Sequence, residues 1–348
     1  MIIFFKSLLF LSLSVLTYCD NPFSTQPIFV STQLDEKHNY RLPNNTRPLH
    51  YNIHLTTNIE QADFDFYGSV EITLEAVENT KNLTIHYRQL TINEVKLIDV
   101  ETKKEIKFNE PHYDEITEHF VIPVESELVN GTQYLLSIEY NGTLRDDLAG
   151  FHKSSYTDDD GNVVRQAGTH FEPHNARHAF PCYDEPSIRT TFDIVITHSN
   201  SYHAVCNMPV KSIEAKENGM VATHFERTPK VQTYLIAFVV SDFSSVSFEK
   251  TDGILYNLYA KPSAIRDGQG DYGLFTGEKI LTNQEKYFQT KFSLPQMSQI
   301  AMPNFGAGAM ENWGIVIYMQ DLLLYDESSE NLQEKHDVGH IIGHEFAR

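Results

Sequence analysis

The sequence predicts a mainly β protein, with an N-terminal antiparallel β-saddle or sandwich domain over residues 46–245 and an α+β region over residues 246–348. Short segments of alternating apolar and polar residues, separated by turn signals, fill the first region. Helical spacing enters only after about Phe248. The 348 residues are 41% apolar and 12% aromatic, which is enough to build hydrophobic cores in about two domains.

The strand prediction for the first region is clearest at VEITLEA (residues 70–76), where every second residue is apolar. This period of two places the apolar side chains on one face of a sheet. Similar segments follow at LTIHY, VKLIDV, YLLSIEY, TFDIVITH and TYLIAFVV, with turn signals such as VNGT, YNGT and DDDGN among them. Many short strands with such turns favour a sandwich or saddle.

The second region mixes strands and helices. YNLYAKP and WGIVIYM predict strands, and TGEKILTNQEKYFQTKF (276–292) predicts a helix with Ile280, Leu281, Tyr287 and Phe288 on one side. Asn331 is expected to cap a final helix, with Glu334 completing a capping box.

The final helix has two notable faces. Val338, Ile341, Ile342 and Glu345 fall on one stripe. Gly339 and Gly343 flatten another side, and glycines with this spacing predict close packing of another backbone.

The first 19 residues have the pattern of a secretory signal peptide: Lys6, an apolar stretch over residues 7–16, then the small residues Thr17 and Cys19. An uncleaved membrane anchor is the alternative. Residues 20–45 are polar and irregular and are interpreted as a linker. No later segment is apolar enough over 18 residues to predict a transmembrane helix.

Glycosylation sequons agree with secretion. They lie at Asn44, Asn82, Asn130 and Asn141, and each is expected to be exposed. We therefore expect a secreted, extracellular protein, or one associated with the cell surface in a longer form.

Charge and cysteine content narrow the function classes. The formal net charge of −20 argues against nucleic acid or an anionic membrane as a partner. Cys182 and Cys206 form either one disulfide or two buried free thiols, and the sequence leaves both open.

The segment VGHIIGHEFAR (338–348) nearly matches the zinc-binding pattern H-E-x-x-H. In that pattern two histidines one helical turn apart bind zinc, and the intervening Glu acts as the base for a metal-bound water. His344 and Glu345 fit the first two positions, but Arg348 stands at the third. A guanidinium is always charged and has no lone pair to offer a metal. A slipped site on His340 and His344, in line with His336, is the alternative, with no third ligand visible.

A glycine-rich segment, PNFGAGAMENWG (303–314), precedes the strand WGIVIYM. Gly306 and Gly308 allow close approach of the backbone to a ligand. Glu311 could receive the ammonium group of a substrate, and the simpler alternative is a turn with a solvated carboxylate.

Three motifs in this order resemble the zinc aminopeptidases of the aminopeptidase N type, the gluzincins. They are GTHFEPHNARHAFPCYDEP (168–186), TYLIAFVVSDF (233–243) and GAMENWG followed about thirty residues later by H-E. The resemblance runs from about Arg47 to Arg348. It implies a β-saddle domain and then the first part of a thermolysin-like catalytic domain that ends on its zinc helix.

The resemblance also implies roles for individual residues. Glu311 and Glu172 would bind the free α-amine of a peptide, and the backbone at Gly308 and Ala309 would hydrogen-bond the peptide in extended form. His344 would be a zinc ligand and Glu345 the general base. The third zinc ligand and a tyrosine that stabilises the oxyanion would lie beyond residue 348.

Two departures from the family pattern bear on function. His170 stands where the family has a glutamine near the amine, and Arg348 replaces the second zinc histidine. We therefore expect Zn²⁺ in the full-length family but no tight zinc binding and no hydrolysis by this chain. The first hypothesis is a secreted zinc aminopeptidase represented by an incomplete sequence. The alternative is a truncated, non-catalytic paralogue that binds peptide N-termini or a protein partner.

Overall fold

The computed structural model describes residues 38–251 and 253–347. The predicted signal peptide and most of the predicted linker lie outside the described residues. From Asn39 onwards the chain forms one compact unit. None of its described helices is both long and apolar enough to cross a membrane.

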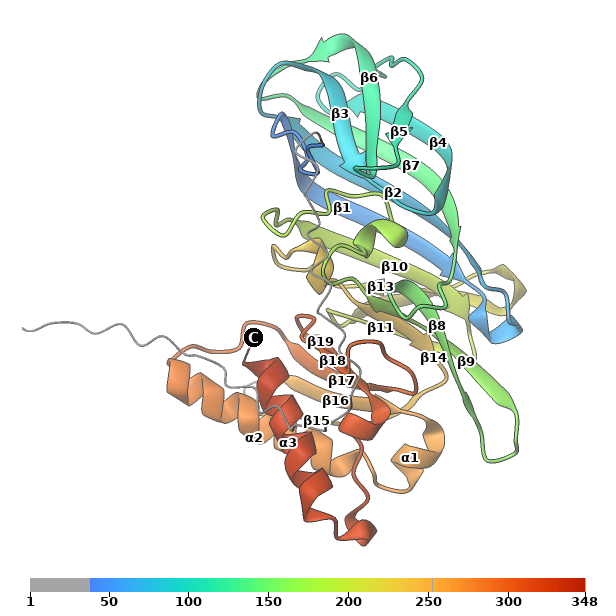
Figure 1. Cartoon of the computed structure of the whole chain (residues 1–348), viewed down its shortest axis with the longest axis vertical. Helices are drawn as coiled ribbons and strands as arrows, with labels where there is room; N and C mark the ends of the chain where they lie inside the picture. Colours follow the sequence, from blue (N-terminus) through green and yellow to red (C-terminus); the bar gives the residue numbers. More distant parts are fainter. Residues whose placement is uncertain (1–37, 252, 348) are drawn as a thin grey trace, which may run out of the picture. The chain divides into compact units, whose positions relative to one another are not determined.

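A seven-stranded sheet dominates the first region (Figure 1). Its order is β12-β13-β10-β1-β2-β7-β4, and every adjacent pair is antiparallel except β1 and β10, which pair in parallel. The strands are β1 (Thr46–Thr57), β2 (Asp65–Ala76), β4 (Leu90–Asp99), β7 (Gln133–Thr143), β10 (Thr191–Ser199), β12 (Val210–Ala215) and β13 (Met220–Phe225). The mainly β, antiparallel prediction is confirmed, with the β1–β10 pair as the exception.

Two smaller sheets complete this region, in the orders β3-β6-β5 and β11-β14-β9-β8. Their strands are β3 (Thr80–His86), β5 (His112–Asp114), β6 (His119–Leu128), β8 (Gly150–Thr157), β9 (Val163–His170), β11 (His203–Cys206) and β14 (Phe238–Ser241). The apolar residues of the alternating segments meet in one core, where the rings of Tyr51 and Phe192 stack with centroids 4.8 Å apart.

The strand predicted at TYLIAFVV is wrong in its first half. Residues Thr233–Leu235 form the short 3-10 helix η4, and the strand begins only at Phe238. The reason is a side chain: the amide of Asn207 accepts from the Ala237 N–H and donates to the Leu235 carbonyl, each at 2.8 Å. Other 3-10 helices are η1 (Ile59–Gln61), η2 (Ala176–His178), η3 (Glu217–Gly219), η5 (Gln320–Leu322) and η6 (Glu327–Ser329).

The second region contains a five-stranded mixed sheet of order β15-β16-β17-β19-β18. Its strands are β15 (Ser244–Glu249), β16 (Leu255–Ala260), β17 (Gln296–Met302), β18 (Ala309–Met310) and β19 (Ile315–Met319). The helices are α1 (Pro262–Arg266), α2 (Asp271–Phe288) and α3 (Leu332–Phe346). Figure 1 shows α2 and α3 side by side, and both contribute to the core on this sheet.

The helix predicted over 276–292 is displaced. It begins earlier, at Asp271, and ends at Phe288, because Gln289 adopts a left-handed conformation (φ 53°) that closes the helix. Tyr287 and Phe288, expected on the buried side, are 81% and 59% exposed. Leu281 is buried and Ile280 packs against the core, as expected, and the other buried residues are Gly273, Leu274 and Gly277.

The final helix agrees better with its prediction. Asn331 accepts hydrogen bonds from the backbone N–H groups of Gln333 (3.1 Å) and Glu334 (3.3 Å). Val338, Ile342 and Glu345 are buried. The packing expected at Gly339 and Gly343 is looser than predicted. Their neighbours are side chains of α2 at 3.5 Å or more from an added Cβ, and no backbone of the described chain comes that close.

Cys182 and Cys206 are both buried free thiols, so the disulfide alternative is excluded.

A third core links the two regions, since Val239 and Phe243 pack with Ile300, Met302 and Phe305. The domain boundaries at 46–245 and 246–348 stay predictions.

Candidate functional site

The C-terminal end of β9 carries His170, with Glu172 two residues further on. The Thr169 hydroxyl accepts from the Phe238 N–H at 3.0 Å, which fixes β9 against β14. An added Cβ on Gly168 would lie 3.0 Å from Met302 Cε, at the end of β17. This close packing brings the end of β9 to the point where the glycine-rich segment begins.

His170 contacts that glycine-rich segment directly. Its ring centroid lies 5.1 Å from that of Phe305, and its Nδ1 lies 3.3 Å from the Leu148 carbonyl oxygen. Because a carbonyl only accepts, Nδ1 holds the proton and Nε2 is left as an acceptor. Burial lowers the pKa of His170, against the raising effects of the Leu148 carbonyl and the Glu172 charge. The imidazole is therefore neutral at pH 7.

The glycine-rich segment leads into β18, the edge strand of the five-stranded sheet. Gly308 has φ +79°, and its carbonyl accepts from the Met319 N–H at 2.7 Å. In an antiparallel pair, hydrogen-bonded and non-hydrogen-bonded positions alternate. Ala309 stands opposite Tyr318 at the next position, so its N–H and C=O point away from β19. Glu311 follows β18 and is half-buried, as is Glu172.

The helix α3 places Glu345 against the same part of the sheet. The Glu345 side chain is 4% exposed, whereas that of His344 is 56% exposed, and His344 Nε2 lies 4.0 Å from Glu345 Oε1. α3 contacts β18. Burial raises the pKa of Tyr318 on β19, and the negative charge of Glu345 raises it further. Glu345 and the buried Tyr318 hydroxyl are therefore within electrostatic range of each other.

The residues present do not fit a zinc site. Among residues 38–251 and 253–347, no group of three or more His, Cys, Asp or Glu side chains could hold a metal ion. His336 and His340 stack with ring centroids 6.2 Å apart. The slipped alternative on His340 and His344 stays a prediction. Arg348 offers no lone pair. Whether the chain binds zinc stays a prediction.

Several residues of this site carry no signal in the sequence. Leu148 precedes β8, and its carbonyl contacts His170, 22 residues later. The fully buried His152 on β8 has its ring centroid 6.2 Å from that of Phe305, 153 residues later. No local pattern encodes either contact. Phe305 itself could have been found, since it adjoins Gly306 in the quoted motif.

The four sequons differ in exposure. Asn44, Asn82 and Asn130 are exposed as expected. Asn141 is half-buried, and its Oδ1 accepts from Asn93 Nδ2 at 3.1 Å. The expectation of full exposure is wrong there, because β7 runs between β2 and β4 and its neighbours cover the side chain.

Comparison with known proteins gives two family matches. Residues 47–235 match the Peptidase M1 N-terminal domain, and residues 272–348 match the Peptidase family M1 domain. Aminopeptidase N of Homo sapiens is 36% identical over 333 residues, which cover 91% of this chain and 34% of that protein. Glutamyl aminopeptidase of Bitis rhinoceros is 34% identical over 326 residues (93% and 34%). Endoplasmic reticulum aminopeptidase 1 of Mus musculus is 33% identical over 348 residues (98% and 36%). The chain thus spans about a third of the length of these relatives.

Proposed function

Because the chain belongs to the M1 peptidase family, we propose that it binds the free N-terminus of a peptide, in extended form, at the edge strand β18. The relatives quoted above are aminopeptidases by name, which supports a metalloaminopeptidase-like role for the full-length protein.

The observation that carries the proposal is the open edge at Ala309. Its outward N–H and C=O can pair with an incoming strand, which is a common way of holding an extended peptide. Glu311 follows two residues later, within about 7 Å along an extended chain. A peptide paired at Ala309 therefore has its ammonium group within reach of this carboxylate, and Glu172 is proposed as the second carboxylate.

Specificity for a free N-terminus follows from this charge. An internal peptide bond or an acetylated N-terminus offers no cation, so a site with two carboxylates would discriminate against both. His170, neutral with Nε2 as acceptor, would add a third group able to receive an N–H of the amine. Unlike His170, the glutamine that the family has at this position cannot change its protonation state.

Hydrolysis by the 348-residue polypeptide is not part of the proposal. His344 as ligand and Glu345 as base are roles that need a metal, and the described residues do not fit one. The alternative, a non-catalytic protein that binds peptide N-termini, is favoured for this polypeptide by Arg348. The signal-like N-terminus and the sequons support our further proposal of a secreted glycoprotein.

Calorimetry with trialaninamide and N-acetyl-trialaninamide, which have no C-terminal carboxylate, tests the binding proposal. We expect trialaninamide alone to bind, and Glu311→Gln to weaken it at least about tenfold, since a hydrogen-bonded ion pair is lost. Glu226→Gln, at an exposed position outside the site, is the matched control. Equal binding of the acetylated peptide would contradict the proposal. Chelator-sensitive turnover of an alanine anilide would show that the polypeptide is an enzyme after all.

A further inference from the structure

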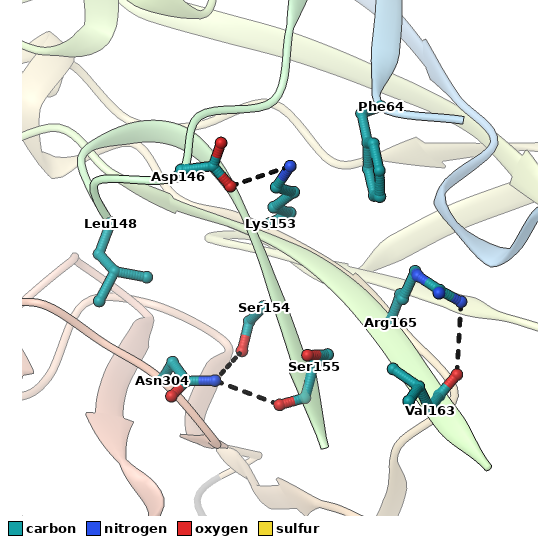
Figure 2. A pocket seen from close by; sticks show the side chains of 9 residues that line it. All are labelled: Phe64, Asp146, Leu148, Lys153, Ser154, Ser155, Val163, Arg165 and Asn304. Carbon is teal, nitrogen blue, oxygen red and sulfur yellow. Dashed lines mark hydrogen bonds and ion pairs between the residues drawn. The ribbon is translucent and has the colours of Figure 1, made fainter. Parts of the chain in front are cut away.

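A pocket of about 470 Å³ opens on the β8–β9 hairpin, and Leu148 is one of its lining residues (Figure 2). Its volume lies within the range of small-molecule sites. Three separate segments supply its walls: Phe64 before β2, the hairpin with its preceding turn, and Asn304 after β17. The lining residues are Phe64, Asp146, Leu148, Lys153, Ser154, Ser155, Val163, Arg165 and Asn304.

Lys153, Arg165 and Asp146 give the pocket lining a formal charge of +1, although the whole chain has a net charge of −20. Lys153 Nζ pairs with Asp146 Oδ1 at 2.9 Å and lies 4.0 Å from the centroid of the Phe64 ring. Arg165 has no carboxylate partner in the described part of the chain. Its guanidinium reaches only the Val163 carbonyl, by one long bond of 3.4 Å. Most of the Arg165 donors therefore remain available to a ligand.

The hairpin register brings the two cations to one face. Ser155 stands directly opposite Arg165 in the β8–β9 ladder, and Lys153 precedes Ser155 by two residues. Their side chains therefore project from the same side of the hairpin, as Figure 2 shows. The Asn304 amide donates to the Ser155 carbonyl (3.1 Å) and the Ser154 hydroxyl (3.4 Å), which ties the floor of the pocket together.

We propose that this pocket binds a small organic carboxylate with an apolar body, such as the C-terminal end of a peptide or an N-blocked amino acid. The planar guanidinium of Arg165 matches a carboxylate through two parallel hydrogen bonds. Phe64, Leu148 and the 54%-exposed Val163 provide apolar surface for the rest of the ligand. A single net positive charge fits a monoanion better than a phosphate dianion, which would also face Asp146.

The pocket shares a wall with the proposed peptide site. The Leu148 carbonyl accepts a hydrogen bond from the His170 ring. The Cβ of Leu148 would lie 3.2 Å from a Cβ added to Gly306. Binding in the pocket does not depend on the proposed function, however, because no amine is required.

Calorimetry of the full chain with N-acetyl-leucine tests the proposal. This probe has a carboxylate and an apolar body but no free amine, so it cannot use the proposed amine site. We expect it to bind and N-acetyl-leucinamide not to bind. Arg165→Gln should weaken N-acetyl-leucine at least about tenfold, and Arg165→Lys by a smaller factor, since the charge remains but the planar fork is lost.

Arg227→Gln is the matched control, because Arg227 is an exposed arginine paired with Asp193 elsewhere on the molecule. Unchanged thermal unfolding of each variant shows that the fold is retained, and Ser155→Val gives a second variant at the pocket if Arg165→Gln does not fold. No binding of N-acetyl-leucine, equal binding by Arg165→Gln, or tighter binding of inorganic phosphate would overturn the proposal. No binding of trialaninamide together with normal binding of N-acetyl-leucine would count against the peptide site alone.

Discussion

Asn207 fixes the backbone beside the candidate site through three hydrogen bonds. Its side chain accepts from the Ala237 N–H and donates to the carbonyls of Leu235 and Trp313, all at 2.8–2.9 Å. Asn207 is only 2% exposed, so water cannot replace these bonds. One side chain thus connects η4 and β14 to the segment that carries Glu311.

Replacing Asn207 by alanine should destabilise the protein strongly. Asn207→Ala leaves three buried backbone groups unpaired, and we expect a loss of about 3 kcal/mol or more in the free energy of unfolding. Urea unfolding measures this loss. Asn200→Ala, at an exposed position seven residues earlier, should change the free energy of unfolding by about 0.5 kcal/mol at most. Similar effects of the two substitutions would mean that the Asn207 bonds contribute little.

At the scale of single residues, the sequence could name candidate site residues, but it could not indicate the environment of each side chain. Motifs named Glu311, Glu345 and His170 as candidates, whose roles stay predictions, and the backbone at Ala309 points outward from β19. The neutral state of His170 could not be predicted. It depends on burial, which lowers the pKa of the ring against the raising effect of the Leu148 carbonyl, and both effects come from the tertiary fold.

The glycines of α2 and α3 show how similar residues have different roles in two adjacent helices. An added Cβ at Gly343 on α3 would lie 4.0 Å from Ile280, which is ordinary contact. At Gly277 on α2 it would lie 2.7 Å from Nε2 of Gln299. Gln299 is 1% exposed and donates to the Gly273 carbonyl, so it cannot move aside cheaply.

These two glycines should respond to alanine in opposite directions. Gly343→Ala should raise the free energy of unfolding by up to about 1 kcal/mol, because alanine is the better helix former and there is room for it. Gly277→Ala should lower it by about 1–3 kcal/mol through overpacking. Thermal unfolding of the two variants side by side checks both signs. Destabilisation by both would mean that α3 packs more tightly on α2 than the structure shows.

Sequence patterns located most elements but not all of their ends. The strands with a clear period of two, such as the one over residues 70–76, were predicted well because burial on one face imposes that period. The ends of α2 and the η4–β14 segment were missed. In the first case a left-handed Gln289 ends the helix, and in the second the Asn207 side chain replaces strand pairing.

For the molecule as a whole, buried histidines make stability depend on pH. His86, His152 and His178 are each at most 5% exposed. Burial lowers the pKa of His86 to about 2, of His152 to about 4 and of His178 to about 3. The Arg177 charge adds to the effect at His86, and the Arg145 charge adds to it at His178. The histidines come from different elements, so no local pattern reveals that all three are neutral.

The folded protein should therefore lose stability between about pH 7 and pH 5. A histidine with a lowered pKa binds fewer protons in the folded than in the unfolded state, so its contribution is complete above about pH 6.5 and falls as the pH decreases towards its folded value. Each of the three histidines should lower the free energy of unfolding by about 2 kcal/mol between pH 7 and pH 5. His86→Gln should make the dependence of the unfolding free energy on pH less steep, by about 2 kcal/mol between pH 7 and pH 5, measured with urea. His112→Gln, at an exposed position, should keep the wild-type slope. A wild-type stability that is flat or rises towards pH 5 would show that these imidazoles take up protons without unfolding.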